Sequence, residues 1–442
     1  MYSMAMKPTS IAIIKTLKDA GFEALWAGGC VRDMLLGIKP KDFDIATNAR
    51  PDDLRKILKK IHPIGEEYGV VIAEEKGHHF EIATFRSDSG YSDGRRPDAV
   101  LFTNAQEDAR RRDFTINALF YDPTEDKIYD YVGGQEDLKN KLVRFIGDPH
   151  ERILEDHLRI IRAIRFKNTF VFQYHPETYQ ALKKHAALSG KVSGERLRDE
   201  FNKMIVTPSF ADALNDMEDT GVLEVVLPEA QAMKGVAQPP EYHTEGDVWN
   251  HTLRAIRALK PESGILLRWA VFLHDIGKPE TFKIAERIRF DQHSEKSAEI
   301  AGEILKRLRF SLKDAKIIQW LIAHHMMVYN VLDMEVGRRR HWFLEPYYLD
   351  LLEVNRCDVA GTTPSDYSTY EKVLAQYRKD IEELPHEPER LLTGEEIMEN
   401  LKIPAGARIG KILEELRFLQ LEKKITTKEQ ANDWLLRSHS LK

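Results

Sequence analysis

The stretch GGCVRDMLLGIKPKDFDIATNARPDDL, residues 28–54, places two glycines and two aspartates close together along the chain. Gly28 and Gly29 follow the short apolar run EALWA, and they let backbone amides approach an anion because they carry no Cβ. Asp42 and Asp44 alternate in a strand-like segment, so their side chains point to one face and can converge on a hard cation. Taken alone, the stretch is compatible with a metal site or with an ordinary turn.

Phosphate chemistry is the function that the surrounding residues favour. Arg32 lies three residues after Gly29 in the expected first turn of a helix, where its guanidinium and the helix dipole would both attract phosphate. Two cations on Asp42 and Asp44, about 3.5–4 Å apart, would activate a hydroxyl and stabilise the leaving oxygen of a displacement at phosphorus. Glu81, on a second predicted strand in HFEIATFR, could supply a third carboxylate or could face solvent at a sheet edge.

Two later segments concentrate arginine next to aspartate. RRRDFTINALF places Arg112 beside Asp113 and in front of an apolar run, which indicates that at least one of its arginines points inwards. In EDHLRIIRAIRF, Asp156 precedes three arginines that recur every three residues, and one helix would align all four along a stripe. These arginines are Arg159, Arg162 and Arg165. Such a row suits the edge of a base and a triphosphate, and a salt-bridged surface helix is the alternative.

The composition is that of a soluble protein with several domains. The chain has 442 residues, of which 42% are hydrophobic and 31% charged, and a single hydrophobic core rarely grows to this length. It contains no apolar run of about 18 residues and begins without the pattern of a signal peptide, so we expect a cytoplasmic protein outside the membrane. The two cysteines, Cys30 and Cys357, are too few for a disulfide framework or a thiolate zinc site.

The charge is unevenly distributed along the chain. A formal net charge of −6 argues against a protein that coats nucleic acid over its whole surface. Residues 151–210, however, hold 11 Lys and Arg against 7 Asp and Glu. A confined basic surface of this kind is compatible with phosphate binding.

Strand and helix patterns divide the chain into an α/β part and a longer helical part. EALWAGG, FDIATNA and HFEIATFRS are strand-like, and from Glu151 onward amphipathic helices dominate, the first spanning ERILEDHLRIIRAIRFKNTF. Proline-containing polar breaks occur at MKGVAQPPEYHTEGD and EELPHEPERLLTGEE. This α+β organisation predicts four domains, residues 1–148, 149–235, 236–385 and 386–442.

In their order, these motifs resemble the class II nucleotidyltransferases, which include bacterial CCA-adding tRNA nucleotidyltransferases and poly(A) polymerases. GGCVRDMLLG with DFDIAT is similar to the metal-binding motif of the family, and RRDFTINAL to its ribose-selecting motif. YVGGQEDLKNKLVRFIGDP resembles its flexible hinge and EDHLR its template for the nucleotide base. SGERLRDEF is similar to the helix motif that steadies this template, so the resemblance spans about residues 20–205.

The resemblance implies a fold and a set of roles. It implies a polymerase β-like α/β head, followed by an elongated all-α body that begins with a neck for the nucleotide base and tRNA. It further implies Mg²⁺ at Asp42 and Asp44, and the position of Glu81 on its predicted strand makes it the candidate for a third catalytic carboxylate. The implied nucleotide-binding residues are Gly29 and Arg32 for the triphosphate, Arg112 and Asp113 for ribose and phosphates, Asp156 and Arg159 for the base edge of CTP or ATP, and Arg162 and Arg165 for triphosphate or template. The tRNA 3′ hydroxyl would attack the α-phosphorus and release pyrophosphate, without a nucleic-acid template.

The choice of nucleotide rests on one more segment. RSDSGYSDGRRPDAVLF resembles the flexible loop that complete CCA-adding enzymes use when they switch from C to A. Arg95, Arg96 and Asp98 in this segment therefore favour complete CCA addition. An A-adding enzyme and a poly(A) polymerase share the core motifs and stay as alternatives.

A second set of residues is spaced like the metal-binding set of an HD domain. His251 lies in VWNHTLRAI, His274 and Asp275 in FLHDIGKPE, and Asp358 in NRCDVAG. Imidazole and carboxylate ligands suit a divalent transition metal, and flanking helices would have to bring the four together. The spare imidazoles His293, His324 and His325 could hold a second ion.

The resemblance of this second set to an HD domain does not decide whether the site catalyses a reaction. HD domains attached to tRNA nucleotidyltransferases can act as phosphatases or 2′,3′-cyclic phosphodiesterases, and they can also persist as scaffolds. A rival interpretation makes the chain chiefly an HD phosphohydrolase whose front half binds RNA. The tail, residues 386–442, is a small helical unit whose basic LEKK could touch tRNA.

Overall fold

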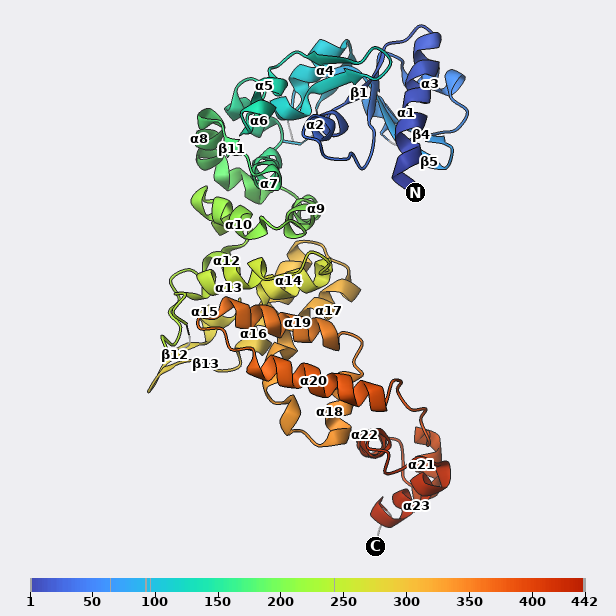
Figure 1. The fold of residues 1–442 in the computed structure, drawn as a ribbon, viewed down its shortest axis with the longest axis vertical. Coiled ribbons are helices and arrows are strands. Elements are labelled where there is room, and N and C mark those ends of the chain that lie inside the picture. The colour runs from blue at the N-terminus through green and yellow to red at the C-terminus, as the bar shows by residue number, and fades with distance from the viewer. Residues whose placement is uncertain (1, 64, 92–93, 96, 242, 440–442) are drawn as a thin grey trace. The chain divides into compact units, whose positions relative to one another are not determined.

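The computed structural model describes residues 2–63, 65–91, 94–95, 97–241 and 243–439 (Figure 1). The chain divides into two compact units, residues 1–228 and 229–442. Within the described ranges, no helix combines the length and apolar character that a membrane crossing requires. The four predicted domain ranges stay predictions.

A mixed seven-stranded sheet forms the centre of the first unit, and its strand order is β3-β4-β5-β2-β1-β8-β9. Its strands are β1 (Ala24–Ala27), β2 (Ile45–Thr47), β3 (Ile61–Pro63), β4 (Val70–Glu75), β5 (His78–Thr84), β8 (Leu119–Asp122) and β9 (Lys127–Asp130). β2 and β5 pair in parallel, and the other neighbouring strands pair antiparallel. The three strand-like segments of the sequence are β1, β2 and β5, as expected.

Among the described residues of this head, five α-helices and a side hairpin accompany the sheet. The helices are α1 (Tyr2–Asp19), α2 (Gly29–Leu35), α3 (Pro51–Ile57), α4 (Ala105–Arg111) and α5 (Gly134–Lys139), and the hairpin is β6 (Arg86–Ser89) with β7 (Ala99–Phe102). β1 and β2 are buried along their whole length, which explains their almost entirely apolar sequences. Trp26 of β1 is buried in the core, and its indole nitrogen donates a hydrogen bond to Ser10 of α1.

Strand pairing places the two halves of the opening motif at the same end of the neighbouring strands β1 and β2. Because β1 and β2 run antiparallel with Trp26 opposite Ile45, the glycines after β1 lie beside the aspartates before β2. The parallel register of β2 with β5 sets Ile45 beside Ile82, so Asp44 is next to Glu81. Residues that are 37 positions apart in the sequence thereby become neighbours.

The first unit continues as helices. These are α6 (Pro149–Glu155), α7 (Arg159–Phe170), α8 (Pro176–His185), α9 (Gly194–Ile205), α10 (Phe210–Asp219) and α11 (Val222–Val226), with the short strands β10 (Leu142–Val143) and β11 (Gln173–Tyr174). One prediction is wrong here: the segment expected to form a single helix is broken between Glu155 and Arg159. Asp156 has an extended backbone and its carboxylate accepts from the amide of Leu158, which ends α6.

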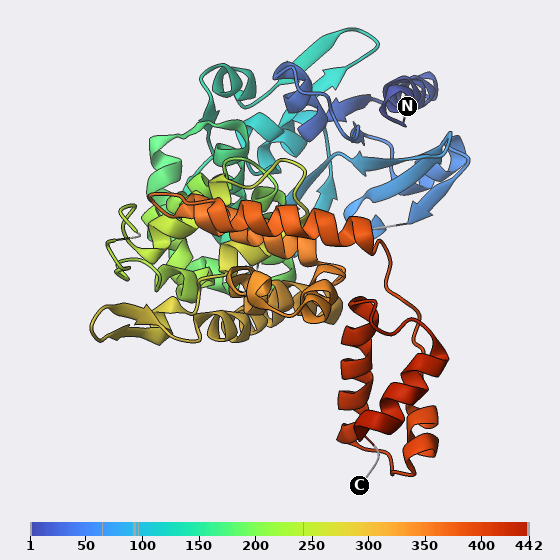
Figure 2. The same cartoon turned by 60° about the horizontal axis from the view of Figure 1, so that its bottom comes forward.

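The second unit is helical, and α12 (Pro228–Gln231) begins at the boundary. Its helices are α13 (Val248–Arg257), α14 (Ile265–Leu273), α15 (Lys278–Thr281), α16 (His293–Arg307), α17 (Leu312–His324), α18 (Val336–Phe343), α19 (Tyr348–Gly361), α20 (Ser368–Glu383), α21 (Gly394–Leu401), α22 (Ala407–Leu421) and α23 (Lys428–His439). α14 is apolar on almost every side and is buried, since it lies among the other helices of this unit. The helices of the tail pack on one another around their own small core (Figure 2).

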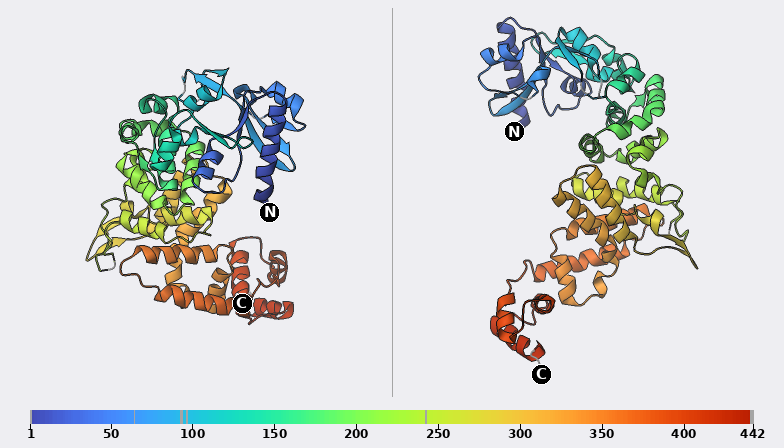
Figure 3. Two further views of the ribbon diagram at one scale, coloured as in Figure 1. Left: turned by 45° about the horizontal axis from the view of Figure 1, so that its top comes forward. Right: turned by 180° about the vertical axis from the view of Figure 1, so that it is seen from behind.

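A hairpin in the second unit was not predicted from the sequence. β12 (Phe282–Ile284) and β13 (Ile288–Phe290) pair antiparallel and project from the helices, which Figures 1 and 3 show from opposite sides. Three-residue strands are too short for an alternating pattern to stand out from the helical sequence on either side.

Candidate functional site

A cleft of about 860 Å³ in the first unit gathers most of the predicted nucleotide and metal residues. Its lining includes Gly29, Arg32, Asp42, Asp44, Glu81, Arg112, Asp113, Arg162 and Arg165. Four carboxylates and four guanidiniums of these residues therefore face one space. This is the charge distribution needed to hold a polyanion together with the cations that screen it.

The carboxylates of the cleft repel one another. Burial and the charges of Asp42 and Glu81 together raise the pKa of Asp44 to about 7, and Arg112 only partly opposes them. Asp44 also anchors the sheet, because its carbonyl accepts from the amide of Ala27. Clustered oxygen ligands whose charge is not balanced by protein groups fit a hard divalent cation.

Arg32 is held ready at the start of α2. Its guanidinium donates to Asp33 and to the side-chain oxygen of Asn117, and it lies 4.5 Å from the ring centre of Phe170. The side chain is buried and its position is fixed by these contacts, so little conformational entropy remains to be lost on phosphate binding. Asn117 is a site residue that the sequence interpretation missed, although it lies inside the recognised RRDFTINAL motif.

Arg112 connects the glycine pair to the arginine motif. Its guanidinium donates to the buried carboxylate of Asp108 and to the carbonyl of Asn117. A Cβ on Gly28 would lie 2.8 Å from Arg112 Nη1, and Gly28 has a φ of +70°, so only glycine fits there without strain. Asp108 is a second residue that the motif patterns did not single out.

Asp113 links the head to α7. One of its oxygens accepts from Asn117, and the other accepts from Arg162, at 2.8 Å from Nε. Burial alone would raise the pKa of Asp113, but Arg162 and Asn117 hold it at about 2. Arg165, one turn further along α7, pairs with Glu200 of α9. The carboxylates fix both arginines where they line the cleft.

A smaller cavity of about 240 Å³ adjoins the cleft and contains the predicted base template. Asp156 and Arg159 line it, and it shares Arg112, Asp113 and Arg162 with the cleft. Arg196 of α9 makes two hydrogen bonds to Asp156, of 3.0 and 2.7 Å. Arg159 is buried and donates to Glu155 and to the carbonyl of Arg152.

The predicted role of the SGERLRDEF helix agrees with this pairing, since Arg196 comes from α9 and fixes Asp156 across 40 residues of sequence. Asp156 and the three arginines do not share one helix, as the break before α7 shows. Of the loop residues expected to affect nucleotide choice, Arg95 lines the small cavity and the amide of Asp98 donates to Gly90. Arg96 lies outside the described residues.

The second unit brings together the four residues of the predicted HD metal set. Candidate ligand atoms of His251, His274, Asp275 and Asp358 all lie within 4.8 Å of one another. His251 Nε2 is 3.0 Å from Asp358 Oδ1, and His274 Nε2 is 3.4 Å from Asp275 Oδ2. Helices α13 and α19 and the end of α14 supply them, as a metal site among helices requires.

The buried polar atoms of this set fit a metal ion. His274 Nδ1 bonds to the carbonyl of Val271, which leaves its Nε2 available as a ligand. Among the described residues, His274 Nε2 is buried and has no hydrogen-bond partner, whereas the buried His251 Nε2 and Asp275 Oδ2 lie 3.0 Å from Asp358 Oδ1 and 2.7 Å from Lys278 Nζ. Leaving a buried polar atom unsatisfied costs about 1–3 kcal/mol, which coordination of a cation by His274 would offset.

Glu245 orients His251 and is a residue that the sequence interpretation missed. Its buried carboxylate lies 3.4 Å from His251 Nδ1 and 2.6 Å from His243 Nδ1. Burial would lower the pKa of His251, but Asp358 and Glu245 raise it to about 9. A carboxylate behind a ligand histidine commonly fixes the ring orientation and strengthens the ligand.

The family comparisons agree with this geometry. The model described as "Poly A polymerase head domain" matches residues 24–144, "Probable RNA and SrmB- binding site of polymerase A" matches 171–234, and "HD domain" matches 247–355. The chain is 32% identical to the A-adding tRNA nucleotidyltransferase of Deinococcus radiodurans over 94% of its own length and 95% of that protein. It belongs to the tRNA nucleotidyltransferase and poly(A) polymerase family.

The alignments of this chain with other members of the family differ in sequence identity and in the share of each chain that they cover. The chain is 41% identical to the CCA-adding enzyme of Lactobacillus johnsonii, in an alignment that covers 54% of this chain but only 61% of that protein. The structure of the Bacillus stearothermophilus CCA-adding enzyme in complex with CTP matches with a TM-score of 0.72 and 26% identity, over 98% of this chain and 97% of that one. The expected fold, a mixed-sheet head followed by helices with an HD domain, is confirmed.

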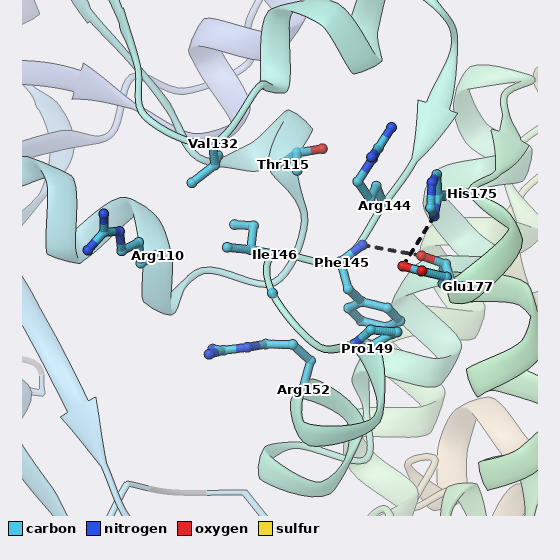
Figure 4. A pocket seen from close by; sticks show the side chains of 12 residues that line it. Arg110, Thr115, Val132, Arg144, Phe145, Ile146, Pro149, Arg152, His175 and Glu177 are labelled. Carbon is cyan, nitrogen blue, oxygen red and sulfur yellow. Dashed lines mark hydrogen bonds and ion pairs between the residues drawn. The ribbon is translucent and has the colours of Figure 1, made fainter.

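The first unit contains a further cavity. It has a volume of about 530 Å³ and shares no lining residue with the cleft (Figure 4). Its arginines are Arg110, Arg144 and Arg152, and each is paired with a carboxylate. Among the described residues, the cavity is lined by a single carboxylate, Glu177, so it lacks the cluster of carboxylates that the cleft offers to a cation.

Proposed function

We propose that this protein is a template-independent, Mg²⁺-dependent CCA-adding tRNA nucleotidyltransferase that uses CTP and ATP to build or repair the tRNA 3′ end. The observation that carries the proposal is the juxtaposition of the carboxylate- and arginine-lined cleft with the small cavity at Asp156 and Arg159. The first space suits a triphosphate with cations, and the second suits the edge of a base. The natural location for such an enzyme is the cytoplasm, where tRNA and both nucleotides occur.

In this proposal each side chain has a separate task. Asp42 and Asp44, with Glu81 beside them, would hold Mg²⁺, which supplies charge that stabilises the attacking and leaving oxygens. Arg32 and the amide of Gly29 would bind the triphosphate, helped by the N-terminus of α2. Arg112, Asp113, Arg162 and Arg165 are the remaining proposed nucleotide-binding residues of the cleft.

Base selection would depend on hydrogen bonds from protein side chains. Aspartate accepts and arginine donates, so Asp156 and Arg159 can together match a base edge that presents both a donor and an acceptor. Arg196 and Glu155 restrict the rotation of these two side chains. A rigid pair discriminates between bases better than a mobile one, because mismatched polar groups stay unpaired in the site.

The proposal is tested with three tRNA transcripts, one lacking the terminal CCA, one lacking only the final A, and one complete. We expect the first to gain CCA with CTP and ATP and the second to gain A, while the complete transcript is not extended. The product lengths are read on sequencing gels. If none of the transcripts is extended by the wild-type protein, the proposal is wrong.

An A-adding enzyme is the second candidate for the same cleft. Its support is the Deinococcus radiodurans relative, which is aligned over nearly the whole chain. It would extend only the transcript that lacks the final A. A poly(A) polymerase would instead add long adenylate tails to unrelated RNA.

For the second unit we propose a metal-dependent phosphohydrolase. His251, His274, Asp275 and Asp358 would hold a divalent transition metal. A cavity of about 520 Å³ opens beside Asp275 and Asp358, and Lys278 and the hairpin arginines Arg287 and Arg289 also line it. This combination of metal ligands and cationic side chains fits a phosphate ester.

The hydrolase proposal is tested with p-nitrophenyl phosphate and a 2′,3′-cyclic nucleotide, in the presence of Mn²⁺, Co²⁺ or Ni²⁺. We expect turnover that His274→Ala abolishes and that Asp44→Asn leaves unchanged. No turnover with any of the three metals would favour a scaffold role. Hydrolysis without any extension of tRNA would favour the interpretation that the chain is chiefly a phosphohydrolase.

A further inference from the structure

The charged groups around the cavity of Figure 4 are mostly cationic. Its charged or titratable lining among the described residues consists of Arg110, Arg144, Arg152, His175 and Glu177. Its volume of about 530 Å³ lies in the range of small-molecule sites, about 300–1,000 Å³. We infer that this cavity binds a nucleoside that carries phosphate groups at two positions, either a free nucleoside bisphosphate or one nucleotide within an RNA chain.

The three arginines of the cavity are held by carboxylates that lie outside it. The closest contacts are those of Arg110 Nη1 with Glu107, Arg144 Nη2 with Asp137, and Arg152 Nη1 with Glu155. None of these three carboxylates belongs to the lining of the cavity. A guanidinium carries five N–H donors, so a pairing through one nitrogen fixes the side chain and leaves donors for a ligand.

The cationic groups lie on two sides of the cavity. Figure 4 shows the side chains of Arg110 and Arg152 on one side. Arg144 and His175 lie on the opposite side, where the carboxylate of Glu177 is 4.0 Å from His175 Nδ1. Arg144 is therefore the group that attracts an anion on that side. Two separated cationic positions fit a ligand with anionic groups at both ends better than they fit a single phosphate.

Apolar side chains lie between these two positions. Val132 and Ile146 line the cavity, and Figure 4 shows them between Arg110 and Arg144. A linear polyphosphate would place charged oxygens against these apolar groups, which costs free energy because the oxygens lose water without gaining partners. A nucleoside instead presents weakly polar faces to them while its two phosphates reach the arginines. This is the reason for assigning a nucleoside bisphosphate rather than pyrophosphate.

The cavity is distinct from the catalytic cleft. Arg110 and Arg112 are two residues apart, yet Arg110 lines this cavity and Arg112 lines the cleft. The cavity also shares no lining residue with the base cavity. It joins Arg110 at the end of α4 to His175 at the start of α8, so a bound ligand would contact both the head and the helices that follow it. Such a ligand favours the arrangement of these two parts in which both contacts form.

The inference is tested by isothermal titration of the full chain with adenosine 3′,5′-bisphosphate, AMP and pyrophosphate. The parent carries Arg32→Ala, and divalent cations are left out, so that binding in the cleft is weakened. We expect the bisphosphate to bind at least about tenfold more tightly than AMP or pyrophosphate. Arg110→Gln and Arg144→Gln should each weaken bisphosphate binding about tenfold, whereas only one of them should weaken AMP binding, because AMP has a single phosphate.

Arg55→Gln is the matched control for Arg110→Gln. Arg55 pairs with Asp52 three residues before it, as Arg110 pairs with Glu107, and Arg55 is not a lining residue of the cavity. The two substitutions remove the same charge from the same kind of ion pair on an α-helix. Arg55→Gln should leave the affinity for the bisphosphate unchanged.

The variants at the other arginines take their partners into account. Asp137 is buried, so Arg144→Gln is accompanied by Arg144→Lys, which keeps a positive charge beside this carboxylate and should weaken bisphosphate binding less. The unfolding midpoint of each variant is measured alongside its affinity. Arg152 is left unchanged, because its partner Glu155 also pairs with Arg159 of the base cavity.

The salt dependence of tRNA binding distinguishes the two sources of the ligand. If an RNA chain occupies the cavity, Arg110→Gln/Arg144→Gln should reduce the slope of log affinity against log salt concentration by about 1.4–1.8, since each phosphate contact contributes about 0.7–0.9. An unchanged slope together with tight binding of the bisphosphate would identify a free ligand. Both results support the assigned chemistry.

Three other outcomes would overturn the inference. Equal affinities for the bisphosphate and AMP would show that the cavity does not recognise two phosphates. Unchanged bisphosphate affinity in Arg110→Gln and Arg144→Gln, or an equal loss in Arg55→Gln, would show that the ligand binds elsewhere. No binding of the bisphosphate, together with an unchanged salt slope, would exclude both sources. A failure of the wild-type protein to extend tRNA would overturn the proposed function and not this inference, because the two sites share no lining residue.

Discussion

Asp44 shows how a single residue couples proton and metal binding. Burial and the charges of Asp42 and Glu81 raise its pKa to about 7, so near neutral pH a bound cation must compete with a proton. The ionised fraction of a group with this pKa rises about tenfold between pH 6 and pH 8. The metal affinity of the head should therefore increase with pH across this range and level off above it.

We expect the head to bind Mn²⁺ about tenfold more tightly at pH 8 than at pH 6, because the proton on Asp44 is removed first. Isothermal titration of a His274→Ala protein, in which the HD site is impaired, measures this affinity. Asp44→Asn has no titrating group at this position and should bind weakly and with little pH dependence. Equal affinity for Mn²⁺ at the two pH values would contradict the assigned role.

Arg196 is the residue that positions Asp156. Arg196→Ala should lower kcat/KM for the correct nucleotide by about 10–100-fold and raise incorporation of UTP and GTP, because hydrogen bonds between charged groups contribute about 1.5–3 kcal/mol. Steady-state incorporation with each of the four nucleotides measures both effects. Arg198→Ala is the control, since Arg198 pairs with its neighbour Asp199 instead. A uniform loss with all nucleotides and no change in selectivity would indicate a purely structural role.

At the scale of elements, the turn from β1 into α2 brings three functions into one short segment. β1 ends at Ala27, Gly28 turns the chain with a positive φ, and α2 begins at Gly29 with Arg32 in its first turn. The close approach of Arg112 to Gly28 makes the absence of a Cβ necessary as well as the backbone conformation. This explains why glycine and not another turn-forming residue stands at position 28.

Gly28→Ala and Gly37→Ala form a matched pair for this element. Their φ angles are +70° and +71°, so each substitution should cost about 1–2 kcal/mol of stability through backbone strain. Only Gly28→Ala displaces Arg112, because nothing lies within 4 Å of a Cβ at Gly37. We expect the unfolding midpoint to fall in both variants, and KM for CTP to rise at least about tenfold in Gly28→Ala alone. Equal KM values in the two variants would show that the contact with Arg112 is unimportant.

At the scale of the whole molecule, the two proposed chemistries lie in different compact units. The cleft and the base cavity are built from residues of the first unit, and the HD cluster and its cavity from residues of the second. Neither set of proposed ligands contains a residue from the other unit. The two activities should therefore be separable by substitution.

The double variant Asp42→Asn/Asp44→Asn should lower nucleotide incorporation by at least about 10³-fold, equivalent to about 4 kcal/mol of transition-state stabilisation. His274→Ala should leave incorporation unchanged and abolish hydrolysis. Asp52→Asn, an exposed carboxylate of the same opening motif outside the cleft, is the control for the head. Loss of both activities in either variant would show that the two sites are energetically coupled.

The sequence by itself determined the chemistry-bearing side chains, since short motifs preserve their local spacing: the glycine pair, Asp42 with Asp44, the adjacent His274 and Asp275. It also predicted β1, β2 and β5, because their buried, apolar segments are distinctive. The carboxylates of the cleft come together through the register of β2 with β5, which sets Asp44 beside Glu81.

Only the tertiary structure decided which partners hold these side chains. Arg196 for Asp156, Glu245 for His251, and His325 rather than His324 near Asp275 could not be read from local pattern. Glu245 is close to His251 in sequence, but it lies in a turn before α13 whose conformation no sequence pattern specifies. The break before α7 and the pairing of Arg196 with Asp156 depend on how whole helices pack. The physical reason is that a motif specifies donors, acceptors and charges over a few residues, whereas their partners are selected by the packing of elements far apart along the chain.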